Sequence, residues 1–155
     1  MRGFYELTTA IKDYLEANNH INTVALKDLD EVDLNKRTIF PLAHINVGSA
    51  SFPDNIIRFD ITVSCMDIVD IVKTNVKDKT TPFFGNDNKQ DILNTMLTVV
   101  NGLNLSLKKG TLSDDLYQLN GEASAEPFED RFENLLTGWS ITFQVDIPNN
   151  EISIC

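Results

Sequence analysis

The chain alternates apolar and polar residues without a break from Trp139 to Ile147. A period of two is typical of a β-strand, because successive side chains point to opposite faces. One face of this strand is therefore predicted to join a core, and the other to meet water or a partner. The polar face carries no histidine or cysteine, so the strand is predicted to be architectural. Its polar residues are Ser140, Thr142, Gln144 and Asp146.

A second segment, from Ile57 to Cys65, alternates in the same way. Two long strands that each have one apolar face favour an antiparallel sheet covered on one side. Two segments with apolar residues at spacings of three and four predict the covering helices, one at residues 4–18 and one ending near residue 104. We therefore predict an α+β fold over residues 1–155, a single domain with a largely antiparallel (mixed) β-sheet and two α-helices packed on one face.

The segment 38–47 is rich in β-forming residues but contains Pro41, which cannot donate a hydrogen bond to a neighbouring strand. It is predicted to be an edge strand, or to be bulged or entered at the proline. Residues 48–55 are predicted to be a connection. Shorter strands are predicted at 21–26 and 116–119, long loops at about 27–37 and 73–88, and a polar, acidic segment at 120–136.

A chain of 155 residues can bury roughly two-thirds of the surface that it exposes when unfolded, so it needs neither a metal nor a disulfide to fold. The net charge of −10 argues against a protein that grips nucleic acid, which depends on Lys and Arg. Cys65 and Cys155 have no zinc-like or disulfide-framework spacing. The first residues resemble no secretory signal and no stretch could span a bilayer, so we expect a protein made and folded in a cytoplasm, with no membrane partner.

The sequence contains no motif that predicts an enzyme. Ser49 lies near His44, but the Gly-x-Ser-x-Gly elbow of hydrolases is absent, and so are glycine-rich phosphate loops. The acids of segment 28–33 lack the glycine and glutamate of a calcium loop. We predict no catalytic residue, cofactor or metal; a small hydrolase or metal-dependent enzyme remains a minor hypothesis, under which His44→Ala or Asp67→Ala would abolish activity.

Three blocks resemble small head–tail joining proteins of tailed bacteriophages, in particular the tail terminators of crAss-like phages and related bacteroidete phages. The blocks are Asp33 to Ile45, Met66 to Asp70, and Glu126 to Glu129 continuing to Gly138-Trp139 and Ile147 to Asn149. The predicted order of helix, strands, loop, helix and strands is also similar to that fold, in which a helix-backed sheet assembles into a ring.

The resemblance implies a structural virion protein. It implies a ring, expected to be a hexamer, which caps the head-proximal end of the tail tube and joins it to the neck or head. A portal-proximal connector or tail-completion protein of the same virion is the alternative. DNA would pass through the lumen without specific binding, and assembly would take place in the host cytoplasm.

A closed ring of identical subunits needs two different complementary patches on each chain. The predicted contacts lie in the long loop, in the acidic segment and on the polar faces of the two strands. They are Phe83, Phe84, Phe128, Phe132, Arg58, Asp60, Thr142 and Gln144.

Overall fold

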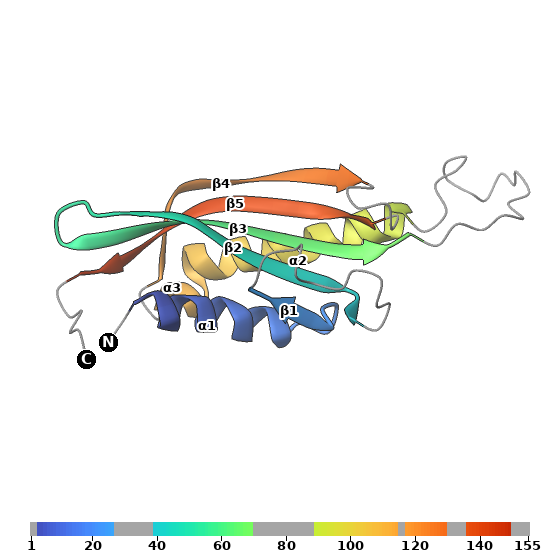
Figure 1. Ribbon diagram of the computed structural model, residues 1–155, viewed down its shortest axis with the longest axis horizontal. Helices are drawn as coiled ribbons and strands as arrows, with labels where there is room; N and C mark the ends of the chain where they lie inside the picture. The colour runs from blue at the N-terminus through green and yellow to red at the C-terminus, as the bar shows by residue number, and fades with distance from the viewer. Residues whose placement is uncertain (1–2, 27–38, 70–88, 115–116, 130–135, 150–155) are drawn as a thin grey trace, which may run out of the picture.

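A computed structural model describes residues 3–26, 39–69, 89–114, 117–129 and 136–149. One sheet runs along the length of the molecule, and the helices lie on one side of it (Figure 1). The elements in chain order are α1 (Phe4–Glu16), β1 (Thr23–Ala25), β2 (Leu42–Ser51), β3 (Ile56–Ile68), α2 (Lys89–Lys109), α3 (Thr111–Asp114), β4 (Gln118–Glu129) and β5 (Leu136–Pro148).

The five strands form a single sheet in the order β1-β2-β3-β5-β4. The first pair, β1 and β2, is parallel, and the other three pairs are antiparallel. The two long helices pack on one face of this mixed sheet, so the predicted α+β single-domain fold is confirmed. The predicted loops at about 27–37 and 73–88 lie outside the described residues.

Both alternating segments form the predicted strands, and they pair with each other at the centre of the sheet. Ile57 lies opposite Ile147, and Cys65 lies opposite Trp139. Their apolar residues point toward the helices and join one core with the buried stripes of α1 and α2. That core includes Leu7, Ile11, Leu15, Ile61, Val63, Met96, Val99, Val100, Leu103, Phe143 and Val145.

The helices differ from the prediction only at their ends. The α1 helix ends at Glu16, two residues earlier than predicted, and α2 continues to Lys109 instead of ending near residue 104. The two helices approach each other at Gly102, where an added Cβ would lie 3.0 Å from the Tyr14 hydroxyl. Burial in this contact raises the pKa of Tyr14.

Strand β2 is entered at the proline, one of the predicted possibilities: Pro41 follows a cis peptide bond, and the strand begins at Leu42. The prediction of a connection from residue 48 is wrong, because pairing continues to Ser51 through a bulge at Gly48. The bulge changes which residues face each side. As a result, Ser49 and Ser51 lie on the same side of the sheet as His44.

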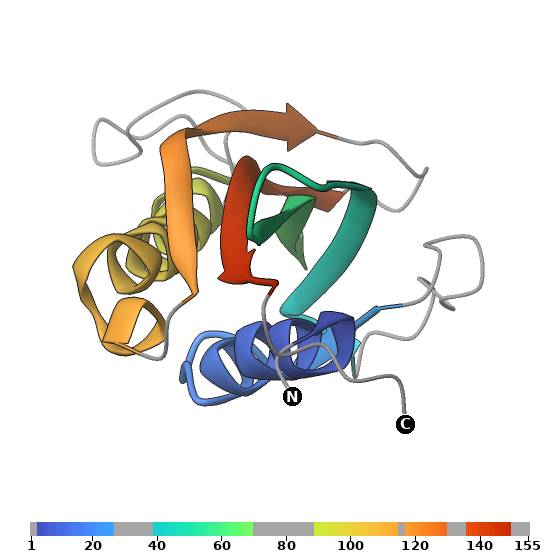
Figure 2. The same ribbon diagram turned by 90° about the vertical axis from the view of Figure 1, so that its left-hand side faces the viewer.

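Strand β4 is longer than the short strand predicted at 116–119, since it continues to residue 129 of the segment described above as polar and acidic. Its pairing with β5 is irregular between Asn120 and Ser124. Gly121 has a φ of 69° there, a conformation that favours glycine. The strand changes direction sharply along its length (Figure 2), so it follows β5 while turning at the sheet edge.

A second, smaller cluster lies on the side of the sheet away from the helices, at the end where β2 begins. Met66 is paired with Leu42 on one side and with Gly138 on the other, and Phe128 follows Gly138 in the same row. The cluster consists of Phe40, Leu42, Met66, Phe128 and Leu136. Phe128 is only 6% exposed, so its prediction as a surface contact is corrected: the ring fills this cluster.

Candidate functional site

The side of the sheet away from the helices is polar over most of its length. We call this side the open face. Residues of β3 and β5 lie directly opposite one another on it, in four successive pairs. The pairs are Arg58 with Asp146, Asp60 with Gln144, Thr62 with Thr142, and Ser64 with Ser140.

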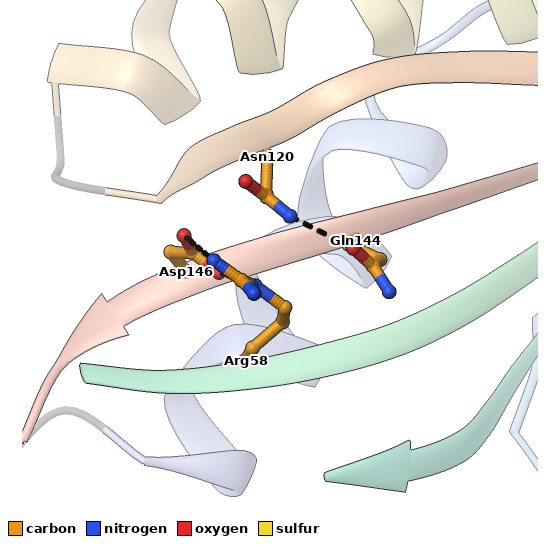
Figure 3. Close-up of polar contacts among 4 residues, drawn as sticks. All are labelled: Arg58, Asn120, Gln144 and Asp146. Carbon is orange, nitrogen blue, oxygen red and sulfur yellow. Dashed lines mark hydrogen bonds and ion pairs between the residues drawn. The ribbon is translucent and has the colours of Figure 1, made fainter. Parts of the chain in front are cut away.

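The first pair is an ion pair with two hydrogen bonds (Figure 3). Arg58 Nε donates to Oδ1 of Asp146 at 2.8 Å, and Nη2 donates to Oδ2 at 3.1 Å. The side chains are 28% and 20% exposed, so the pair is partly sheltered. The hydrogen bonds to Asp146 raise the pKa of Arg58. This cation is therefore already bound to a carboxylate in the geometry that an arginine fork prefers.

A chain of hydrogen bonds crosses four strands beside the ion pair. Asn120 Nδ2 on β4 donates to Oε1 of Gln144 at 2.8 Å (Figure 3). Gln144 also bonds the Asp60 carboxylate, and Ser49 Oγ on β2 donates to Oδ2 of Asp60 at 2.6 Å. The hydrogen bonds from Ser49 and Gln144 lower the pKa of Asp60, as does the nearby charge of Arg58. The network holds Asp60 as a carboxylate.

Hydroxyl pairs continue the polar surface toward the small cluster. The Oγ1 atoms of Thr62 and Thr142 are 3.3 Å apart, and the Oγ atoms of Ser64 and Ser140 are 2.7 Å apart. Facing hydroxyls stabilise a pair of strands across the sheet. Because these polar groups bond to one another, part of the hydrogen-bonding capacity of the open face is already satisfied within the chain.

The residues considered for hydrolysis are not assembled into a catalytic arrangement. Ser49 pairs with Asp60, four residue pairs along the ladder from His44, and its hydroxyl donates to Asp60. His44 is buried opposite Ser64. Asp67 accepts from the backbone of Ile68 at 2.8 Å, as a strand-end carboxylate often does. In the part of the chain that the structure describes, no group of three or more His, Cys, Asp and Glu could hold a metal ion.

Four of the predicted contact residues come together on the open face: Arg58, Asp60, Thr142 and Gln144. Sequence reasoning missed Ser49 and Asn120, which complete the network. Ser49 enters it through the bulge in β2, and Asn120 belongs to the strand that the sequence did not predict at its true length. Phe83, Phe84 and Phe132 lie outside the described residues.

Exposed large apolar side chains gather at three places within the described residues. Two leucines lie on the outer side of α2, and one phenylalanine lies in the turn between β2 and β3. The third place is a groove of about 370 Å³ between α1 and the sheet edge, which we call the α1–β1 groove. Its lining includes Phe4, Tyr5, Lys12, Val24, Leu26 and Ile45.

Comparison with protein families found no matching family, and comparison with curated proteins found no match. Neither α1 nor α2 could cross a bilayer, and no other helix in the described ranges has the required length and hydropathy.

Proposed function

We propose that this protein is a structural component of a bacteriophage virion. In this proposal, copies of the chain form a ring, expected to be a hexamer, at the head-proximal end of the tail. The ring caps the tail tube and joins it to the neck or head. The proposal rests on the resemblance of the three sequence blocks to head–tail joining proteins and on the helix-backed sheet.

The observation that carries the proposal is the open face. It is a broad polar surface that none of the described helices covers, and its side chains are already bonded to one another across four strands. The arginine on this surface, Arg58, is neutralised by a bidentate carboxylate, and Asp60 is held ionised beside it. In its described part, a wall of this kind offers DNA phosphates no unpaired arginine, and phosphate binding depends on free cations. Such a surface suits the lumen of a ring through which a genome passes.

The apolar surfaces support assembly from copies of one chain. Head-to-tail contacts close into a ring only when each copy carries two different complementary patches. The α1–β1 groove and the turn between β2 and β3 are separate in the structure and formed by different residues. They supply two such patches, while the open face remains free to line the lumen.

The decisive experiment is the mass of the purified protein by native mass spectrometry, with negative-stain microscopy of the same sample. We expect a closed ring, and we expect it to bind tail-tube protein in a pull-down. A ring that binds portal or connector protein, and not the tube, would favour the connector alternative. A monomer at every accessible concentration, with and without tail-tube protein, would overturn the proposal.

The lumen assignment has its own test. A variant with Asp60→Lys and Glu126→Lys adds two cations to the open face. We expect wild-type rings to leave double-stranded DNA unretarded in low salt, and rings of the variant to retard it. Glu6→Lys with Asp13→Lys, on the exposed side of α1, is the matched control with the same net charge. Equal retardation by both variants would argue against the open face as the lumen wall.

A further inference from the structure

The turn between β2 and β3 presents an aromatic side chain to solvent. Phe52 is 71% exposed, although a phenylalanine normally buries its ring. The turn, residues 52–55, which we call the hairpin tip, projects past the N-terminal end of α1 (Figure 1). Phe52 is therefore held at one extremity of the molecule.

The hairpin tip is held in place by its own backbone. The amide of Ile56 donates to the carbonyl of Pro53 at 3.2 Å, and Asn55 takes a left-handed φ of 64°, which asparagine tolerates. The amide of Asn149 donates to the carbonyl of Asn55 at 2.9 Å, so the turn is tied to the end of β5. An aromatic group on a fixed turn loses little entropy when it binds.

The α1–β1 groove offers a complementary surface. Tyr5 is 82% exposed, while Phe4 and Leu26 are each about half exposed. Phe4 also contacts the ring of Phe59 at a centroid distance of 6.2 Å, which fixes one wall on the core. The groove volume of about 370 Å³ falls within the range of roughly 300–1,000 Å³ of pockets that enclose small ligands. It has ample room for one aromatic side chain.

The charges at the two surfaces are opposite. Among the described residues that line the groove, Lys12 is the charged one, and Asp54 is the charged residue of the hairpin tip. Lys12 is paired at 3.4 Å with Glu16, and both side chains are about half exposed. An exposed pair of this kind is weak and can exchange partners. Two copies of a chain with net charge −10 repel each other, so a contact that joins a cation to an acid is favoured.

We propose that the hairpin tip of one copy binds in the α1–β1 groove of the next copy, with Phe52 as the anchor and Asp54 beside Lys12. The inference rests on the proposed ring and names its subunit contact. Phe52 is not among the residues that line its own groove, so the tip has to meet the groove of another copy. The contact is head-to-tail, which generates a ring when its rotation closes.

The anchor alone does not make the whole interface. One aromatic side chain buries about 150–250 Å², against roughly 1,200–2,000 Å² for a stable protein interface. The surfaces beside the groove, including the short edge strand β1, are the surfaces that the neighbouring copy would also cover. Phe52 is expected to act as a hot spot inside this wider contact.

The test uses two variants that each remove one side of the contact. Phe52→Ser removes the anchor, and Leu26→Glu places a charge in the groove; both positions are exposed, so both variants should fold. Each variant alone should lose association on the order of 30-fold, as expected for a hot spot. An equimolar mixture should form a dimer and nothing larger, because only one intact tip and one intact groove remain. Leu105→Glu, at an exposed position on α2, is the matched control and should assemble like wild type.

A charge reversal tests the orientation. Lys12→Glu should weaken assembly, and adding Asp54→Lys to the same chain should restore it. If Phe52→Ser and Leu26→Glu each assembled as strongly as wild type, this contact would be overturned while the proposed ring would stand. Assembly that depends on Phe52 but produces particles without affinity for tail or neck proteins would support the contact and overturn the proposed function. A monomeric wild type would overturn both.

Discussion

The two faces of the central strand pair follow opposite rules although they share one backbone. On the helix side of β3 and β5, apolar side chains such as Ile61 and Phe143 are buried against α1 and α2. On the open face, the residues next to them in sequence form paired polar contacts, such as Thr62 with Thr142. One face gains stability by removing apolar area from water, and the other by satisfying polar groups locally.

This difference separates the roles of neighbouring residues. A change on the helix side is expected to cost folding free energy in proportion to the volume lost. A change in the polar pairs of the open face is expected to cost little stability and to act mainly on what the face contacts. Substitutions at adjacent positions of the same strand can therefore test assembly without testing the fold.

The strongest test of this comparison is a substitution at Gly138, in the row of paired residues where the open face becomes apolar. A Cβ on Gly138 would lie 1.9 Å from the carbonyl oxygen of Cys65 and 2.9 Å from Cα of Met66. Both are backbone atoms of the paired strand, so β3 and β5 would have to separate. We expect Gly138→Ala to lower the free energy of unfolding by more than about 3 kcal/mol, beyond ordinary overpacking. Urea denaturation followed by circular dichroism measures this loss.

The matched control for Gly138 is Gly48→Ala. A Cβ at Gly48 would come no closer than 3.8 Å to the carbonyl oxygen of Asp60, an ordinary contact distance. We expect this variant to unfold at nearly the wild-type urea concentration. Equal stability of the two alanine variants would contradict the close approach of the β3 and β5 backbones at Gly138.

The next test places one substitution on each face at consecutive residues. Ile61 is fully buried, so Ile61→Ala should cost about 2–5 kcal/mol. Thr62→Ala removes one partner of a hydroxyl pair and should cost less than about 1 kcal/mol. Thermal or chemical unfolding of both variants gives the two values. Equal losses would mean that the open face contributes to the fold as the core does, contrary to the comparison.

The central strands could be predicted because each has one fully buried face, which makes a period of two visible in the sequence. Strand β4 has no such face: most of its residues are exposed or half buried, and it contains Gly121 and Pro127. Residues of this kind are typical of an edge strand and of a loop alike, so sequence patterning did not separate the two. The buried position of Phe128 followed from this strand and was missed with it.

The polar network depends on the register in which the strands pair, and the local sequence pattern does not specify that register. Ser49 reaches Asp60 because the bulge at Gly48 shifts the remainder of β2 by one residue. Asn120 reaches Gln144 because β4 pairs at the far side of β5. The four predicted residues of the open face were found because alternation alone places them on one face.

A substitution at Trp139 tests how α2 is attached to the sheet. Its indole Nε1 donates to the backbone carbonyl of Leu93 at 2.9 Å, which ties α2 to β5. We expect Trp139→Phe to lower the free energy of unfolding by about 1 kcal/mol for the hydrogen bond, in addition to a packing loss. Hydrogen exchange should show faster opening of α2 around Leu93, while β3 is unchanged. Uniform loss of protection across the sheet would show that Trp139 acts only through packing.

The smallest expected effect is a dependence on pH that belongs to the open face alone. Hydrogen bonds from Ser49 and Gln144 lower the pKa of Asp60 in the folded chain. A lowered pKa means that the folded state favours the carboxylate more than the unfolded state does. Its contribution is therefore present above the ordinary pKa of an aspartate and is lost as the pH falls through that value toward the lowered one.

Asp60→Asn removes this contribution, so its free energy of unfolding should fall less steeply with decreasing pH than that of wild type. The difference between the two slopes should correspond to the uptake of less than one proton on unfolding. Ser49→Ala, which removes the first donor, should give part of the same change. Glu126→Gln is the control, because it removes a carboxylate from the same face without touching either donor. Unfolding midpoints measured from pH 7 down to pH 3 supply the slopes. Identical slopes for Asp60→Asn and Glu126→Gln would show that the network does not hold Asp60 ionised, and that the polar pairs of the open face are arranged without being energetically coupled.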